Sequence, residues 1–541
     1  MAIWPACGRL LRTRSSSLDA GDNPISAPMT NRFLGLFTPA PLTESIKLYL
    51  SANAFLRAAG IGRGLLLTWW MISPAEFGVY QLGLLLVNLL LPILSFGSYE
   101  AVARFVPEHE SKGQLWRYLR RALPLSLIVG VGLCGVLFVL AGPVSRVVGG
   151  AITPASAADR AALIRLTAIC VVVLVLYHLV VGVLRGRRMF RALSVMELTA
   201  GLLFTGGAVI AAALGGGSGI VVLAIYTAAN LMTALVFGAA ALWLVWREPH
   251  EPAAPARPGV MRNLLIFGFW AGWAAFSWQL LMSLPALYLN RVCGEEVFAT
   301  YRAMTIFTQL GYIIPAAVSV AVAASVNRIW EVSGREVSVG RLQLATRAVL
   351  LATLLLCLLL ASLKSVIVLA FSESYREGAQ AVQLLLIFYV LAGGLSLVTI
   401  RFTLIKKTAY TFLCWAGGCV GALLIAVVGI QPESSQQALV MTAWAGVGGV
   451  CVALLMALVL SYRSRLMPDR GTLLLLAATF LLLAPTAYLV AGGLAVALFA
   501  AGTKAVFSPD ERQVLLRQAS QLFRFQLVDT DPPTSDNQSQ S

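Results

Sequence analysis

The chain has 541 residues, of which 59% are hydrophobic and only 12% are Asp, Glu, Lys or Arg. Soluble domains carry about 25% charged residues. The mean hydropathy of +0.82 arises from repeated apolar runs that are long enough to cross a bilayer. The composition therefore predicts a polytopic membrane protein and excludes a soluble enzyme, a disordered chain and a secreted disulfide scaffold. The net charge of +16 is scattered in short clusters between apolar runs, so we expect no nucleic-acid partner.

The eight cysteines and three histidines form no recognisable ligand set. Six cysteines lie inside apolar runs, where cysteine acts as a small hydrophobic residue, and there is no CxxC pair. The histidines are isolated from one another in the sequence. We therefore expect no disulfide framework, no metal site and no cofactor.

The chain begins with a polar arm, residues 1–42, that holds no apolar run of signal-peptide length. We predict that this arm is disordered and cytoplasmic. Twelve segments of spanning length follow. Their approximate limits are 48–72, 79–99, 122–142, 161–184, 192–214, 220–246, 264–289, 297–323, 348–371, 378–400, 408–430 and 438–460.

A final apolar stretch, residues 472–507, is too long for one comfortable span and short for two. Pro485 and the pair Gly492–Gly493 favour two short helices in a tight hairpin; the alternative is one long kinked helix. Of the 40 basic residues, 31 lie in the termini and in alternate loops, which predicts that both termini are cytoplasmic. This favours an even number of spans, 14 within a range of 12 to 14.

An internal repeat of about 220 residues relates the two halves of the chain. The turn at Glu76 leads into an apolar helix with Pro92, and the turn at Glu296 leads into a helix with Pro315. Six spans per unit keep both units in the same orientation. The predicted fold is all-α, with two parallel-repeat six-helix lobes around a central cleft and a short C-terminal hairpin. Secondary transporters have this plan, and a scaffold without transport is the alternative.

The polar, proline-rich segment between the sixth and seventh spans predicts a linker between the lobes. The C-terminal tail is basic at first and then rich in Asp, Pro, Ser and Gln, which predicts a cytoplasmic end. The predicted parts are the arm 1–42, the N-lobe 43–246, the linker 247–262, the C-lobe 263–465, the helix pair 466–507 and the tail 508–541.

Two arginines, Arg57 and Arg63, lie close to the middle of the first predicted span. An arginine at the bilayer centre costs about 2.5–3.5 kcal/mol, so both need a cavity or a counter-ion. Six residues place them about 120° apart around the helix, on two borders of a wide cleft. Their planar, permanently charged forks suit a diphosphate. Snorkelling or a structural pair with Glu197 is the alternative. Arg302, early in the eighth span, is a further substrate-binding candidate, with snorkelling equally open.

Four other intramembrane residues are candidates for function. Glu197 in the fifth span either neutralises an arginine, which we favour, or takes part in ion coupling. His178 in the fourth span is a coupling candidate because its charge changes near neutral pH, although packing is the commoner role. Trp270 and Trp273 share a face of the seventh helix and suit stacking against sugar rings, with packing or lipid contact as the alternative.

Several segments resemble the bacterial polysaccharide-type flippases of the multidrug/oligosaccharidyl-lipid/polysaccharide exporter superfamily. These are Pro74-Ala-Glu-Phe-Gly-Val-Tyr80, then Arg104-Phe-Val-Pro-Glu108, and Glu373-Ser-Tyr-Arg-Glu-Gly-Ala379 in the second half. The resemblance covers roughly residues 43–510. It implies alternating-access transport of an undecaprenyl-diphosphate-linked oligosaccharide from the cytoplasmic to the periplasmic leaflet of the bacterial inner membrane. The product would feed O-antigen, capsule or exopolysaccharide synthesis, with polysaccharide polymerase or export machinery and membrane lipids as partners.

Three other functions compete with this expectation. A cation-coupled multidrug exporter of the same superfamily would carry an acidic residue early in a lobe, where this chain has arginines. A lipid-II-type flippase also uses a cationic cavity, but has a longer groove at its last two helices. A polytopic glycan polymerase or ligase would need a substantial external loop with catalytic groups, and the external loops here are short. We therefore expect a transporter with no catalytic residues, and not an enzyme.

Overall fold

The computed structural model describes residues 35–38, 42–70, 73–110, 113–148, 157–215, 218–247, 260–405 and 407–515. The regular structure in these ranges is entirely helical, which confirms the predicted all-α class. Within the described ranges, nine helices are long and apolar enough to cross a membrane. The chain is therefore a multi-pass membrane protein. The predicted arm lies almost entirely outside the described residues, as do most of the linker and the tail beyond residue 515.

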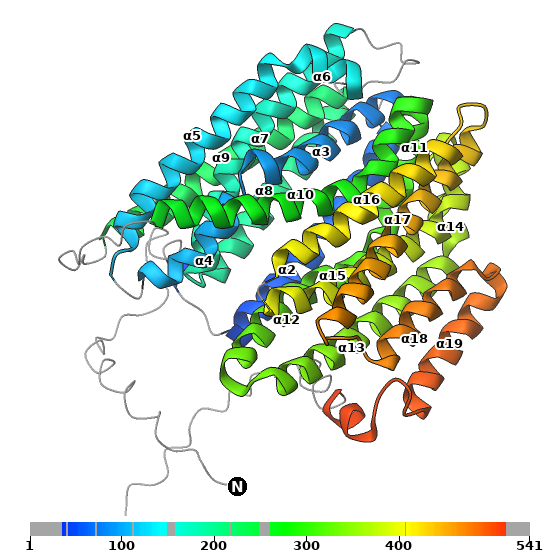
Figure 1. Ribbon diagram of the computed structural model, residues 1–541. Coiled ribbons are helices and arrows are strands. Elements are labelled where there is room, and N and C mark those ends of the chain that lie inside the picture. Colours follow the sequence, from blue (N-terminus) through cyan, green and yellow to red (C-terminus); the bar gives the residue numbers. More distant parts are fainter. Residues whose placement is uncertain are drawn as a thin grey trace, which may run out of the picture.

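The helices form two lobes side by side, the first in blue to teal and the second in green to orange (Figure 1). The first lobe contains α2 (Leu42–Trp70), α3 (Pro74–Leu94), α4 (Ser98–Glu110), α5 (Leu115–Val139), α6 (Ala141–Val148), α7 (Ala157–Gly186), α8 (Phe190–Ala213) and α9 (Gly219–Arg247). The second contains α10 (Val260–Cys293), α11 (Glu295–Thr308), α12 (Leu310–Ser333), α13 (Arg335–Ser362), α14 (Lys364–Leu369), the 3-10 helix η1 (Glu373–Gln380), α15 (Ala381–Leu404), α16 (Thr408–Gly429) and α17 (Ser435–Arg463). The predicted two-lobe plan is thus confirmed, with eight helices in the first lobe and nine helical elements in the second among the described residues.

Each lobe is built around one central helix. In the first lobe α7 packs against α3, α4, α5 and α9, and in the second α15 packs against α12, α13 and α17. Both helices are apolar around their whole circumference, and most of their side chains are buried. A helix of this kind belongs in the interior of a bundle, whereas helices such as α5 and α16 expose apolar faces that suit lipid.

The first difference from the predicted spans lies at residues 95–97, where the predicted helix 79–99 divides into α3 and α4. Phe96 and Gly97 both have positive φ, 54° and 59°, which ends the regular helix. Gly97 also lies directly against the carbonyl oxygen of Gly268 in α10, so a side chain there has no room. After this corner α4 packs against α7 of its own lobe and against α10 of the second. Part of the segment 100–121, between the second and third predicted spans, is therefore helical.

Two further differences concern the second lobe. The predicted span 297–323 is divided at Gln309 into α11 and α12. Pro315 lies inside α12, six residues beyond this division, where it has no N–H to donate to the carbonyl of Gly311. The predicted loop 327–347 is helical on both sides of Gly334, whose φ of 83° reverses the chain.

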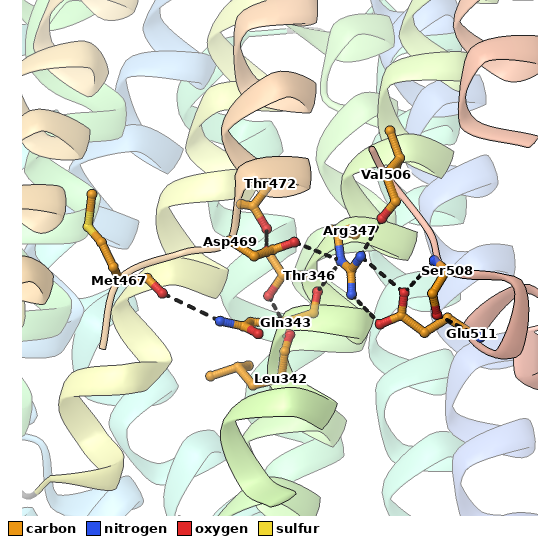
Figure 2. A network of polar contacts seen from close by, with 10 residues as sticks. All are labelled: Leu342, Gln343, Thr346, Arg347, Met467, Asp469, Thr472, Val506, Ser508 and Glu511. Atoms are coloured by element: carbon orange, nitrogen blue, oxygen red, sulfur yellow. Dashed lines mark hydrogen bonds and ion pairs between the residues drawn. The ribbon is translucent and has the colours of Figure 1, made fainter. Parts of the chain in front are cut away.

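Both ends of the C-terminal segment contact one residue of α13, Arg347 (Figure 2). Arg347 Nε lies 3.1 Å from Oδ2 of Asp469, directly before α18 (Arg470–Ala478). Its Nη2 lies 2.5 Å from Oε1 of Glu511, and its Nη1 donates to Glu511 Oε2 at 3.2 Å and to the carbonyl oxygen of Val506. Val506 and Glu511 both follow α19 (Thr486–Gly502). One buried guanidinium therefore holds both ends of the segment.

The turn of this segment lies at the other end of the second lobe. Gln383, near the start of α15, donates its Nε2 to the carbonyl oxygen of Ala484 at 3.2 Å. The 3-10 helix η2 (Thr479–Leu483) ends there, and Pro485 directly precedes α19. The predicted C-terminal hairpin of two short helices is confirmed.

We name the two ends of the bundle by their charged residues. At the Glu76 end, α3, α9 and α11 begin together: Gly219 N donates to Glu76 Oε2 at 2.7 Å, and a Cβ on Gly78 would lie 2.5 Å from the carbonyl oxygen of Glu295. The opposite end is the Arg347 end. These two names are used below.

Candidate functional site

A cavity of about 520 Å³ lies between the lobes. Most of its wall comes from the first lobe (α2, α3, α7, α8 and α9), and α11 and α12 of the second lobe complete it. A volume of this size is typical of a small-molecule site. The cavity is thus at the predicted central cleft, but the two lobes contribute to it unequally.

The cavity is lined on regular helical faces. On α2 the lining residues include Arg57, Gly60, Ile61 and Gly64, which follow the i, i+3, i+4, i+7 spacing of one helix face. Glycine at two of these positions removes bulk beside the arginine and leaves open volume. The cavity is therefore built into the sequence pattern of the first transmembrane helix.

Arg57 and Arg63 both line the cavity, and they point to different sides of it. Arg57 is exposed and acts electrostatically on the hydroxyls of Tyr312 and Tyr389 in the second lobe. Arg63 is directed toward its own lobe, where Nη1 donates to Thr205 Oγ1 at 3.2 Å. The six-residue spacing on α2 produces this divergence, as expected from about 100° per residue.

Arg302 reaches the same cavity from the second lobe. Its Nη2 donates to Oε1 of Gln81 in α3 at 3.3 Å, so this contact crosses between the lobes. Its Nε is buried without a hydrogen-bond partner in the described part of the chain. The hydroxyls of Tyr80, Tyr301 and Tyr389 lie within its electrostatic range. All three predicted arginines are therefore brought together at one cavity.

Glu197 and His178 also line this cavity. On α8, Glu197, Gly201 and Phe204 share one face and are all lining residues. His178 stands on α7 between two aromatic rings, with centroids 5.2 Å from Tyr99 and 5.5 Å from Tyr177. Among the lining residues, three arginines and one glutamate carry formal charge at neutral pH, so the cavity is cationic.

Trp270 and Trp273 lie elsewhere. They are 48% and 39% exposed on α10, and neither lines the cavity. Trp273 makes edge contacts with Phe269, Phe276 and Phe412, with ring centroids about 6 Å apart. The rotation of α10 about its axis places these rings in an exposed aromatic group, and their contact with sugar remains a prediction.

Sequence reasoning missed the neutral polar groups of the cavity. These include Gln81 and Asn88 on α3, Asn230 on α9, and Thr305 and Gln309 on α11 and at its end. Amide and hydroxyl groups of this kind hydrogen-bond readily to sugars. An available signal was the presence of asparagine or glutamine inside otherwise apolar runs. For potential ligands of another type, no group of three or more His, Cys, Asp or Glu side chains suited to a metal ion occurs in the described ranges.

Comparison with known proteins supports the interpretation of the fold. Residues 64–326 match the family described as polysaccharide biosynthesis protein. Just under half of the chain is therefore similar to this family. This match covers the last two turns of α2, all of α3 to α11 and most of α12, and thus most of the helices that line the cavity. The sequence matches no curated protein.

Solved structures resemble this chain over most of its length. The lipid II flippase MurJ in an inward closed conformation superposes with a TM-score of 0.60 at 13% identity, covering 87% of this chain and 99% of that one. A MOP-superfamily transporter from Pyrococcus furiosus, described as having a binding pocket of reverse polarity, superposes with a TM-score of 0.57 at 15% identity. The match covers 80% of this chain and 98% of that one. A multidrug resistance transporter in an outward-facing conformation gives 0.57 at 16%, with 80% and 98% covered. These neighbours are named as flippases or transporters, and the likeness shows that the chain shares their fold.

Proposed function

We propose that the transporter moves an undecaprenyl-diphosphate-linked oligosaccharide across the bacterial inner membrane for polysaccharide synthesis. The convergence of Arg57, Arg63 and Arg302 on one cavity carries this proposal. A diphosphate offers several charged oxygens, and guanidinium groups donate paired hydrogen bonds to such oxygens without losing their charge. Three cations placed around an intramembrane cavity are therefore suited to a lipid-linked diphosphate.

The remaining groups of the cavity fit the rest of such a substrate. Asn88, Asn230 and Gln309 supply amides for the hydroxyl groups of a sugar. Glu197 balances part of the positive charge, and with His178 it is the candidate for ion coupling. We place Trp270 and Trp273 outside this cavity as candidate sugar contacts along the exposed part of α10.

We propose that the substrate moves from the cytoplasmic to the periplasmic leaflet by alternating access. In this scheme the Glu76 end faces the periplasm and the Arg347 end faces the cytoplasm, with both termini cytoplasmic. The bias of basic residues supports this orientation. The lobes contact each other at the Glu76 end, where Phe77 in α3 lies against Tyr375 in η1 with ring centroids 5.8 Å apart. Rocking of the two lobes would open that end.

Export assays with single arginine variants test this function. Arg57→Ala, Arg63→Ala and Arg302→Ala each remove a cation that would bind phosphate, and we expect each to lower polymer export by about 10- to 100-fold. Arg165→Ala is the matched control, because Arg165 lies in the span of α7, is exposed and does not line the cavity. Normal export by all three cavity variants, at equal membrane insertion, would refute the proposal.

Lipid II is a competing substrate because the same cationic cavity suits any polyprenyl diphosphate. Flipping of short-chain polyprenyl diphosphates with different head groups in proteoliposomes separates the two. Faster transport of a pentapeptide-bearing head group than of a purely oligosaccharide head group would favour the lipid-II-type alternative. A cation-driven drug exporter would transport neither lipid and would instead expel amphipathic cations.

A further inference from the structure

The contact between Gln81 and Arg302 joins equivalent positions of the internal repeat. The run Phe77-Gly-Val-Tyr-Gln81 in α3 corresponds to Phe298-Ala-Thr-Tyr-Arg302 in α11, with phenylalanine and tyrosine at the same places. The two helices pack against each other where the lobes meet. The repeat therefore presents one amide and one guanidinium to each other, each from the same position in its own lobe.

The hydrogen bond between Gln81 and Arg302 is buried, and its acceptor is a neutral amide. Gln81 is only 7% exposed, and the Nε of Arg302 is also enclosed. Gln81 Oε1 accepts from Arg302 Nη2 at 3.3 Å, a long hydrogen bond for a charged donor. A neutral amide holds a guanidinium less strongly than a carboxylate or a phosphate does. The guanidinium is thus held, but by an acceptor that a charged oxygen can replace.

The same contact lies at the inner edge of the interface between the lobes. On the Glu76 side of it, Gly78 approaches the backbone of Glu295 so closely that a Cβ would lie 2.5 Å from the carbonyl oxygen. Trp69 Nε1 donates to the carbonyl oxygen of Ala370 at 3.0 Å, which ties α2 to the second lobe. On the other side of the contact, Gln81 and Arg302 both line the cavity. The hydrogen bond between Gln81 and Arg302 therefore lies both in the closed interface between the lobes and in the wall of the cavity.

We propose that Gln81 and Arg302 form a latch that substrate releases. In the empty cavity Arg302 is bonded to Gln81 and helps to hold α3 against α11. A phosphate oxygen in the cavity takes over the guanidinium, and the closed interface loses this hydrogen bond. Occupancy thereby shifts the equilibrium toward opening at the Glu76 end, because the substrate removes an interaction that exists only in the closed state. The release step rests on the proposed function, whereas the latch itself does not.

A cysteine reporter measures the state of this interface directly. Asn88 lies two turns beyond Gln81 on α3, is exposed and lines the cavity, so Asn88→Cys reports whether reagents reach the cavity from the Glu76 side. A membrane-impermeant maleimide is applied from that side in right-side-out vesicles. The chain with Asn88 intact is the blank, since Cys293 is half-buried at the same end.

Two near-isosteric variants of Gln81 change the latch in opposite directions. Gln81→Glu replaces the amide by a carboxylate that pairs with Arg302, so we expect labelling of the reporter to fall by about tenfold. Gln81→Met removes the acceptor at similar volume, so we expect labelling to rise by about fivefold without substrate. Unchanged labelling in both variants, at normal insertion, would overturn the latch.

The repeat offers a sharper control in the exchanged double variant. Gln81→Arg combined with Arg302→Gln rebuilds the same contact with the donor on the other lobe, and we expect labelling to return to the parent level. Arg302→Gln alone places two amides together and is expected to raise labelling about fivefold. A double variant that labels like this single variant would contradict the latch, because the pair and not either residue alone is inferred to hold the interface.

Substrate dependence is tested with farnesyl diphosphate in the same vesicles. We expect it to raise labelling in the parent and to have little effect in Gln81→Glu, where the carboxylate competes with phosphate. A parent that does not respond to the diphosphate would refute substrate release. If the Gln81 variants still shift labelling as expected, the latch stands while the proposed substrate fails. If export depends on Arg57 and Arg63 but the Gln81 variants label normally, the function stands while the latch fails.

Discussion

The guanidinium carbon of Arg63 lies 4.1 Å from the centre of the Phe204 ring. Arg63 also donates to Thr205 Oγ1, the neighbouring residue on α8, so a ring and a hydroxyl fix its direction together. Phe204 in turn contacts Tyr226 edge-on, with centroids 4.9 Å apart. An aromatic ring and a hydroxyl thus orient an intramembrane cation at the wall of the cavity, where a ligand would bind.

Loss of the Phe204 ring is expected to weaken substrate binding through Arg63. Cation–π contacts of desolvated groups contribute about 2 kcal/mol, so Phe204→Leu should raise the Kd for a polyprenyl diphosphate by up to about 30-fold. Phe204→Tyr retains the ring and serves as the matched control. Equal affinity in both variants, measured by tryptophan quenching in detergent, would show that the ring does not orient the arginine.

Gly78 is expected to be intolerant of any side chain. A Cβ would lie 2.5 Å from the backbone oxygen of Glu295, so Gly78→Ala must move α3 away from α11. We expect increased labelling of the Asn88→Cys reporter from the Glu76 side. Gly62→Ala in α2 is the control, because a Cβ there meets nothing within 4 Å and alanine favours a helix. Parent-like labelling in Gly78→Ala would contradict the close approach.

Arg347 is expected to dominate the stability of the C-terminal hairpin. Its side chain is 10% exposed, and Arg347→Gln would leave Asp469 and Glu511 without their cation. Breaking a buried pair costs about 3–5 kcal/mol, so the melting temperature should fall clearly. Arg376→Gln removes an exposed pair with Glu373 and should cost at most about 1 kcal/mol. Similar melting temperatures for the two variants would argue against the anchoring role.

The same anchor predicts a loss of stability in acid. Burial raises the pKa of Glu511, but hydrogen bonds from Arg347 and Ser508 outweigh this effect and hold the pKa below its usual 4.5. The stabilisation is therefore complete above pH about 4.5 and is lost as the pH falls through the lower pKa of the folded state. Thermal melts from neutral to acidic pH should show a step that Glu511→Gln lacks. A step of equal size in that variant would assign it to another group.

Hydropathy predicted the spans well because a segment that crosses lipid forms a helix, in which every backbone group is hydrogen-bonded, and carries apolar side chains. Long apolar runs are therefore easy to recognise in the sequence. It did not predict the corner at Gly97 or the break at Gln309, since both depend on packing between the lobes. The intramembrane charges identified Arg57, Arg63, Arg302, Glu197 and His178 as candidates, and the cavity collects all five. Charged residues are rare inside membrane spans because their burial costs free energy, so the few that occur stand out in a single sequence.

Other features of the site left little trace in the sequence. Gln81 is one polar residue in an apolar helix, and its importance follows from its equivalence to Arg302 across the lobes. Trp270 and Trp273 were assigned by mid-helix position, whereas the rotation of α10 decides what they contact. Arg347 directly precedes the ninth predicted span, among the basic residues between spans, and the charge pattern cannot tell a surface cluster from a buried anchor. In each case the deciding neighbour lies far away along the chain.

The dependence of Arg347 on Glu511 has a consequence for biosynthesis. During translation, α13 is inserted long before the ribosome reaches residue 511, so the guanidinium waits for its final partners until the last helices are made. A nascent chain that stops before Val506 lacks both acceptors at that side of the anchor. Synthesis of the segment up to Glu511 would thus distinguish a finished protein from a truncated one, and premature stop codons in the last segment should send the product to membrane proteases.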